Sequence, residues 1–101
     1  MIQDGKIFVY IDFKIKDKEA FQEYSQGVPA TMKLYGGRSI GVQLGANFVV
    51  GLKDVDVQVI QEWPSNQAFI AWQNSAEYAP LKLLRDTKAL ENLTMSIIKA
   101  L

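Results

Sequence analysis

Two strand–helix patterns, related by a shift of 48 residues, constrain the fold of this chain more than any other feature. The shift aligns the alternating apolar residues Ile7, Val9 and Ile11 with Val55, Val57 and Val59. It also aligns Asp17-x-x-Ala20-Phe21-x-x-Tyr24 with Ser65-x-x-Ala68-Phe69-x-x-Trp72. Alternation is typical of a half-buried strand, and a capping residue before apolar residues at helical spacing predicts a helix. Duplication of one unit and convergence of two units both explain the pattern, and both predict two β-α halves.

The remaining patterns complete a β-α-β-β-α-β order in a single domain that covers residues 1–101. We expect strands over 6–15, 38–44, 55–63 and 92–99, with the second strand continuing through 48–50 after a bend. We expect helices after Asp17 and Ser65, the first reaching Gly36-Gly37 with or without a break at Pro29, and a shorter helical stretch over 76–88. This order predicts an α+β fold of the ferredoxin-like type, with a four-stranded antiparallel sheet.

The absence of two residue types narrows the chemistry. The chain has no cysteine and no histidine, which excludes disulfides, cysteine-ligated metals, thiolate catalysis and serine–histidine triads. We therefore expect no metal and no cofactor. Eleven Lys and Arg residues balance eleven Asp and Glu residues, so the net charge argues against nucleic acid and anionic membranes as partners. We expect a cytoplasmic protein, because the N-terminus is unlike a signal peptide and no apolar run spans a membrane.

The two faces of the predicted sheet differ in polarity. The face of Ile7, Val9 and Ile11 is uniformly apolar, and we expect it to lie beneath the helices. The opposite, open face carries Phe8, Tyr10, Asp12, Ile60 and Glu62. An exposed apolar patch usually marks an interface, so we expect a homodimer that forms through the open face. The alternative is a mixed face that stays in contact with water.

Arg38 and Glu62 are the candidate catalytic residues. Arg38 opens the second strand directly after a glycine pair, where its guanidinium is able to clamp a carboxylate or enolate of a ligand. Glu62 shares the open face with Asp12, and two carboxylates on a partly buried face raise one another's pKa and provide a general base. The structural alternative is an Arg38–Glu62 ion pair that only ties two strands together.

Five further residues are candidate ligand-binding residues: Tyr10, Asp12, Tyr35, Trp72 and Tyr78. Aromatic side chains of this kind form the walls of pockets for small organic molecules. The main alternative for Trp72 is a place in the core, because it lies at helical spacing from Phe69. Ser75 is expected to cap the turn that carries Tyr78. Lys82 and Arg85 lie three positions apart on a helix and are expected to face solvent.

Several short motifs together resemble one protein family. They are Tyr35-Gly36-Gly37-Arg38, Glu62-Trp63-Pro64-Ser65, Ala71-Trp72, Ser75-Ala76-Glu77-Tyr78, Pro80-Leu81-Lys82 and Arg85. Over residues 6–98 they resemble the family of domain of unknown function 1330, within the dimeric α+β barrel superfamily. The resemblance implies a ferredoxin-like protomer and a homodimer with facing sheets, and it implies no activity. The superfamily includes small monooxygenases, isomerases and haem-dependent enzymes; haem would need an axial ligand other than histidine here.

Two hypotheses about function follow. In the first, the protein binds a small organic molecule in a pocket between sheet and helices. That hypothesis includes cofactor-independent chemistry of the oxygenase or isomerase type, with Arg38 as anion clamp and Glu62 as base. In the second, the protein is a non-catalytic dimeric module whose polar residues only stabilise the fold. Substitution of Arg38 separates them, because the first predicts loss of binding and the second predicts loss of stability.

Overall fold

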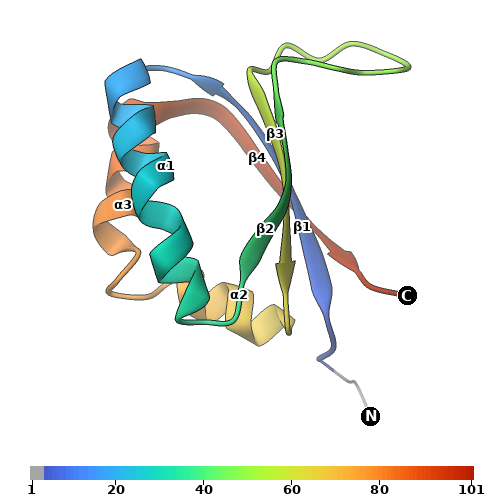
Figure 1. Ribbon diagram of the computed structural model, residues 1–101, viewed down its shortest axis with the longest axis vertical. Helices are drawn as coiled ribbons and strands as arrows, with labels where there is room; N and C mark the ends of the chain where they lie inside the picture. The colour runs from blue at the N-terminus through green and yellow to red at the C-terminus, as the bar shows by residue number, and fades with distance from the viewer. Residues whose placement is uncertain (1–3) are drawn as a thin grey trace.

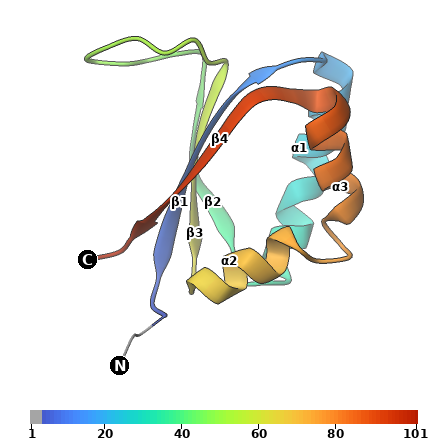
Figure 2. The ribbon, with the colours of Figure 1, turned by 180° about the vertical axis from the view of Figure 1, so that it is seen from behind.

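The computed structural model describes residues 4–101, and its four strands form one antiparallel sheet in the order β2-β3-β1-β4 (Figure 1). The strands are β1 (Ile7–Ile15), β2 (Arg38–Leu44), β3 (Val57–Trp63) and β4 (Leu90–Lys99). The helices are α1 (Lys18–Lys33), α2 (Asn66–Gln73) and α3 (Ala79–Leu84), which continues into a π-helical turn, Arg85–Ala89. All helices lie on one face of the sheet and leave the other open (Figure 2). This arrangement confirms the ferredoxin-like α+β fold.

Both predicted helix caps are present. The Asp17 carboxylate and the Ser65 hydroxyl each accept a hydrogen bond of 3.0 Å from the backbone N–H three residues later. These bonds satisfy N–H groups that have no partner inside the helix. α1 continues through Pro29 and ends before Gly36, whose φ of 82° is a conformation that glycine adopts without strain.

The length and apolarity of the helices bear on whether the described chain crosses a membrane. No helix among residues 4–101 combines the length and the apolarity that crossing a membrane requires. The start of the chain, where we expect no signal peptide, includes residues 1–3, which lie outside the described residues.

Residues 45–56 form a projecting loop, called the arm below, and here the strand prediction is wrong. β2 ends at Leu44 instead of continuing through 48–50, and β3 begins later than the alternating valines indicate. The physical reason is a pair of glycines, Gly45 and Gly51, with φ of 80° and 78°, which turn the chain out of the extended conformation. The arm extends away from the helices, on the side of the open face (Figure 1).

The arm is anchored at its base and uncovered at its tip. Val49 and Val50 at the tip are 98% and 89% exposed. Two ion pairs and one hydrogen bond to a carboxylate, each 2.7 to 2.8 Å long, connect the base to the sheet: Lys53–Asp12, Lys14–Asp54 and the Ile15 N–H to the Asp56 side chain. The arm therefore keeps a defined direction although its apolar tip contacts little of its own chain.

The chain after α2 also differs from the prediction. The stretch 76–88 is not one helix, because Pro80 stands in the first turn of α3 and residues 76–78 form a separate turn. The Ser75 hydroxyl accepts a hydrogen bond of 3.1 Å from the Tyr78 N–H, as predicted for a capping serine. β4 begins at Leu90, two residues earlier than expected, because Leu90 already pairs with the end of β1.

The core lies between the sheet and the helices. Trp63 packs against the backbone of Gly37, where a Cβ would stand 2.5 Å from the indole ring. Glycine is therefore required at this position for close approach of the loop to the sheet. The predicted inner face is confirmed by four buried strand residues, and helix residues cover it: Ile7, Val9, Ile11 and Val57, with Met32, Trp72 and Tyr78.

Candidate functional site

A cavity of about 290 Å³ lies between α1 and the inner face of the sheet. Its wall is mostly apolar and includes Phe21, Val28, Val42, Val59, Leu93 and Met95. The polar members of the wall are Tyr24, Ser25, Ser39 and Gln61. None of the described residues that line it carries a formal charge, so the cavity fits an uncharged and largely apolar molecule.

The exposed part of the cavity wall on the sheet, called its mouth below, is formed by Ser39, Val42 and Leu44 of β2. This strand forms one edge of the sheet, and all of its residues are exposed. Val42 pairs with Val59 of β3, so both side chains point to the inner face, and Val42 remains 59% exposed. The edge position therefore leaves apolar side chains accessible on the helix side, where a ligand is able to enter without unfolding the core.

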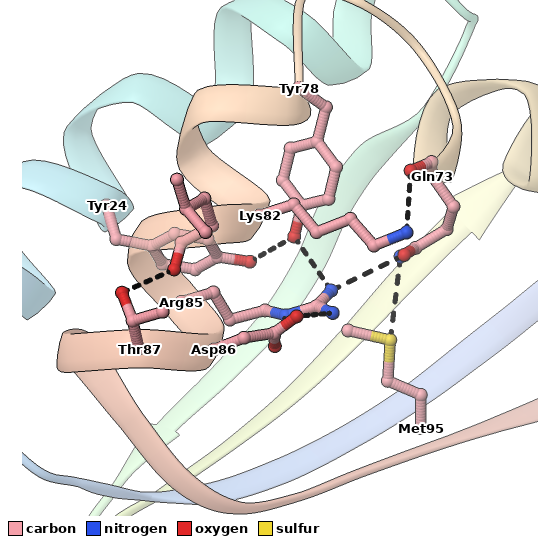
Figure 3. A network of polar contacts seen from close by, with 9 residues as sticks. Tyr24, Gln73, Tyr78, Lys82, Arg85, Asp86, Thr87 and Met95 are labelled. Carbon is pink, nitrogen blue, oxygen red and sulfur yellow. Dashed lines mark hydrogen bonds and ion pairs between the residues drawn. The ribbon is translucent and has the colours of Figure 1, made fainter.

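A polar network connects Tyr24, which lines this cavity, with side chains around α3 (Figure 3). The hydroxyl groups of Tyr24 and Tyr78 lie 2.6 Å apart, and Arg85 Nη1 donates to the Tyr78 hydroxyl at 3.2 Å. The guanidinium also forms two bonds with the Asp86 carboxylate, of 2.7 and 3.1 Å. Gln73 accepts from Arg85 Nη1 at 3.4 Å. The network reaches the cavity wall through Tyr24, which belongs to both.

Arg85 stands where α3 passes into the π-helical turn, seven positions and about two helical turns after Tyr78, so both side chains lie on one side of the helix. Arg85 is 8% exposed, so the expectation of a solvent-facing residue is wrong. Lys82 also departs from the expectation, since its Nζ donates to the Gln73 carbonyl at 3.2 Å. Buried guanidinium groups require partners for their donors, and Asp86, Gln73 and Tyr78 provide them.

The environment keeps both tyrosine hydroxyls protonated. Burial raises the pKa of Tyr24 far above its usual range, and the neighbouring Tyr78 hydroxyl adds to this effect. Burial also raises the pKa of Tyr78, although Tyr24 and Arg85 oppose the shift. Burial acts to lower the pKa of Arg85, but the Asp86 carboxylate and the Tyr78 hydroxyl together outweigh it, and the pKa is raised. The network therefore contains two neutral hydroxyls and one ion pair, formed by the Arg85 guanidinium and the Asp86 carboxylate.

Trp72 and Tyr78 lie in the core behind the cavity rather than in its wall. Their rings stack with centroids 3.9 Å apart, and both residues are fully buried. The Trp72 indole N–H donates to the Thr31 hydroxyl at 2.9 Å. Tyr35 lies at the surface end of the same region and donates to Glu77 at 2.9 Å. Of the predicted ligand-binding aromatics, Tyr78 alone contacts a residue of the cavity wall through its hydroxyl.

Arg38 and Glu62 form the ion pair that the structural alternative describes. Arg38 Nε lies 2.8 Å from the Glu62 carboxylate, and Lys6 Nζ lies 2.6 Å from its other oxygen. Hydrogen bonds from Lys6 and Arg38 hold the pKa of Glu62 below its usual range. Glu62 pairs with Phe8 of β1, and its side chain is on the open face. The pair is therefore separated from the cavity by the sheet.

Tyr10 and Asp12 also lie on the open face, in a separate cluster. The Asp12 carboxylate accepts from Tyr10 at 3.0 Å, contacts Lys53 at 2.8 Å and accepts from the Thr94 hydroxyl. Burial acts to raise the pKa of Asp12, but the bonds from Lys53, Thr94 and Tyr10 outweigh it and lower the pKa. The expectation that Asp12 and Glu62 raise one another's pKa is thus wrong, because each carboxylate has its own cations.

Sequence reasoning missed Tyr24 and Arg85 as site residues. Tyr24 was expected only as an apolar anchor of its helix, although the 48-residue shift aligns it with Trp72. Arg85 is one of two arginines in the chain. What identifies them is their contact in the folded protein, where the Tyr24 hydroxyl on α1 and the Arg85 guanidinium after α3 both meet the Tyr78 hydroxyl.

Comparisons with known proteins agree with the fold. The family model described as Domain of unknown function (DUF1330) matches residues 6–101. The RPA0582 protein of unknown function from Rhodopseudomonas palustris has a TM-score of 0.84 and 20% identity, over 98% of this chain and 85% of that chain. SnoaB, a cofactor-independent oxygenase from Streptomyces nogalater, has a TM-score of 0.64 and 13% identity, over 95% and 93%.

A third structure, a dimeric ferredoxin-like protein of unknown function from Thermobifida fusca, has a TM-score of 0.66 and 12% identity, over 99% of this chain and 95% of that chain. At these identities the likeness shows the fold alone. Comparison with curated proteins gives no significant match.

Proposed function

This chain belongs to the DUF1330 family, whose description names no reaction, and we propose from its geometry that it binds a small, largely apolar organic molecule. The binding site is the cavity between α1 and the inner face of the sheet. The observation that carries the proposal is the cavity itself: about 290 Å³ of space with an apolar wall and an accessible mouth. Ligand pockets of small molecules begin near this volume and have this kind of lining.

A second, more specific part of the proposal is that the protein performs cofactor-independent chemistry on the bound molecule. SnoaB, described as a cofactor-independent oxygenase, has the same fold, which supports considering that class here. Within the described residues, the cavity wall has hydroxyl and amide groups but no carboxylate or amine. A proton abstraction in the cavity would therefore need a base supplied by the ligand or by water. The rival proposal is a dimeric module that performs no chemistry.

A fluorescence titration tests binding. N-phenyl-1-naphthylamine is a neutral aromatic dye whose emission rises in apolar surroundings, and we expect saturable binding to the wild-type protein. Val42→Trp fills the mouth, so we expect the dissociation constant to rise by about tenfold or more. Gln43→Trp adds the same side chain to the opposite face of β2 and is expected to bind as the wild type does. Equal effects of both substitutions would place the dye elsewhere and contradict the proposal.

We also propose that the protein is a homodimer that forms through the open face. Apolar side chains gather there around one shallow hollow: Phe8, Tyr10, Ile40, Ile60 and Ile98. The apolar arm tip extends on the same side (Figure 2), and the Thermobifida fusca protein is described as dimeric. A second copy would cover surfaces that are otherwise costly to expose. Arg38 and Glu62, if they act as clamp and base, act at this interface and not in the cavity.

Light scattering after size-exclusion chromatography tests the dimer. We expect the wild-type protein to have twice the chain mass of 11.4 kDa. Ile60→Lys puts a charge in the centre of the open face and is expected to produce monomers. Leu83→Lys is the matched control, since Leu83 is an exposed apolar residue of α3 on the other side of the sheet. A monomeric wild-type protein at micromolar concentration would contradict the proposal.

A further inference from the structure

The donors and acceptors of the buried network determine which tyrosine donates. A guanidinium has only donors, so Arg85 Nη1 donates to the Tyr78 oxygen across 3.2 Å. Tyr78 and Tyr24 each have one hydroxyl proton, and either can occupy the 2.6 Å contact between the two oxygens. Only one of the two protons fits between them. The other must find a different acceptor.

The positions of the two hydroxyls decide between the arrangements. If Tyr24 donates to Tyr78, the Tyr78 proton has no further acceptor among residues 4–101, and Tyr78 is 0% exposed. A buried hydroxyl proton without an acceptor is unfavourable. If Tyr78 donates to Tyr24, the Tyr78 hydroxyl has an acceptor for its proton, and its oxygen accepts from Arg85. The hydroxyl proton of Tyr24 then still needs an acceptor. Tyr24 belongs to the cavity wall, and a molecule bound in the cavity would offer an acceptor for that proton.

We propose that Tyr24 directs its hydroxyl proton into the cavity, and that the molecule bound there carries a carbonyl oxygen that accepts it. This inference rests on the proposed function of the cavity and adds the class of ligand: a ketone or quinone oxygen on an apolar body. Tyr24 is the residue that touches the ligand, and Tyr78 and Arg85 are positioning residues that act through it. The guanidinium at the far end polarises both hydroxyls in the same direction, which strengthens the last donor.

Most of the remaining cavity wall is apolar and fits the body of such a molecule. Val28 precedes Pro29 on the α1 wall, and Val59 and Met95 lie opposite on the sheet. Met95 is also fixed from behind, because the Gln73 amide donates to its sulfur at 3.6 Å (Figure 3). A carbonyl at the Tyr24 end is therefore the polar group of an otherwise apolar ligand.

Two matched probes test the inference: 2-acetylnaphthalene and 2-isopropenylnaphthalene, which differ by an oxygen in place of a CH2 group. Each is titrated against bound N-phenyl-1-naphthylamine in the wild-type protein, in Tyr24→Phe and in Thr87→Val. The ratio of the two dissociation constants cancels differences in overall hydrophobicity. We expect the preference for the ketone to fall roughly 3- to 10-fold in Tyr24→Phe. Thr87→Val removes an exposed hydroxyl that donates to the Leu83 carbonyl, and we expect no change.

A second measurement needs no variant. The stretching frequency of the ¹³C-labelled carbonyl in the wild-type complex is expected to be lower than in hexane, because a hydrogen bond weakens the C=O bond. An unshifted carbonyl, or an equal ratio in wild type and Tyr24→Phe while both probes bind, would overturn the inference and leave the proposed function standing. If neither probe displaces the dye and the dye itself does not bind, the proposed function fails and the inference with it.

Discussion

The hydroxyl oxygens of Tyr24 and Tyr78 lie 2.6 Å apart, although 54 positions separate the two residues in the chain. The contact joins α1 to the turn before α3, and Arg85 extends it into the π-helical turn. Three segments of the helical layer are thus connected by one buried chain of hydrogen bonds. The same chain of hydrogen bonds ends at the wall of the apolar cavity, so the proposed ligand binding would depend on groups that also stabilise the fold.

Removal of the Tyr78 hydroxyl is expected to destabilise the fold. Tyr78→Phe leaves Arg85 with one acceptor fewer and removes the partner of the buried Tyr24 hydroxyl, so we expect a loss of about 1–3 kcal/mol. Urea unfolding, followed by tryptophan fluorescence, measures it. Tyr35→Phe is the control, because that hydroxyl bonds to Glu77 at the surface and its loss is expected to change stability by less than about 0.5 kcal/mol. Equal losses in the two variants would refute the role of the network.

Gly37 is expected to tolerate no side chain. A Cβ there would stand 2.5 Å from the Trp63 ring, which is fully buried and has no room to move. We expect Gly37→Ala to lower the free energy of unfolding by about 1–3 kcal/mol. Gly41→Ala on the same segment meets nothing within 4 Å, and its melting temperature is expected to stay close to that of the wild type. Comparable melting temperatures for both variants would show that the Trp63 contact is looser than described.

The stability of the protein is expected to depend on pH through Asp12. Its pKa is lowered from the usual 3.8 in the folded protein, so the unfolded chain binds the proton more readily. The contribution is fully present above the unfolded pKa and is lost as the pH falls through the lower, folded pKa. We expect Asp12→Asn to be less stable at neutral pH and to lose less stability than the wild type below about pH 4. Parallel curves for the two proteins would contradict this prediction.

Substitution of the open-face ion pair is expected to leave the cavity unaffected. Arg38 is an exposed residue, and exposed ion pairs contribute about 1 kcal/mol or less. We therefore expect Arg38→Ala and Glu62→Gln to bind N-phenyl-1-naphthylamine with the wild-type dissociation constant and to unfold at similar urea concentrations. Loss of dye binding in a folded Arg38→Ala protein would contradict this prediction and place the binding site on the open face, where Arg38 lies.

The fold was predictable because its signals are local. Asp17 and Ser65 cap their helices within three residues, and alternation along β1 identifies its inner face directly. The second strand was overextended because Phe48, Val49 and Val50 have strand propensity, whereas the two left-handed glycines decide the path of the arm. Strand propensity alone therefore does not predict that the chain leaves the sheet after Leu44.

The candidate site was less predictable because its contacts join distant segments. Arg85 is typical of an exposed helix face in sequence, and it is buried because α1 packs against the turn that begins with it. Asp12 is buried by Lys53, which approaches from the arm 41 positions away. The Arg38–Glu62 pair was foreseen as an alternative, but its separation from the cavity depends on which face of the sheet both residues share.

The proposal that a small molecule binds between α1 and the inner face of the sheet is tested most directly by locating the bound molecule. Methyl NMR spectra of the full chain, with labelled isoleucine, leucine and methionine, report contacts on both faces of the sheet. On addition of 2-acetylnaphthalene we expect the signals of Ile11, Leu93 and Met95, which line the cavity, to shift with a common saturation curve. We expect Ile60 and Ile98 on the open face to stay unchanged. Shifts confined to Ile60 and Ile98 would contradict the account, because they would place the ligand on the other side of the sheet.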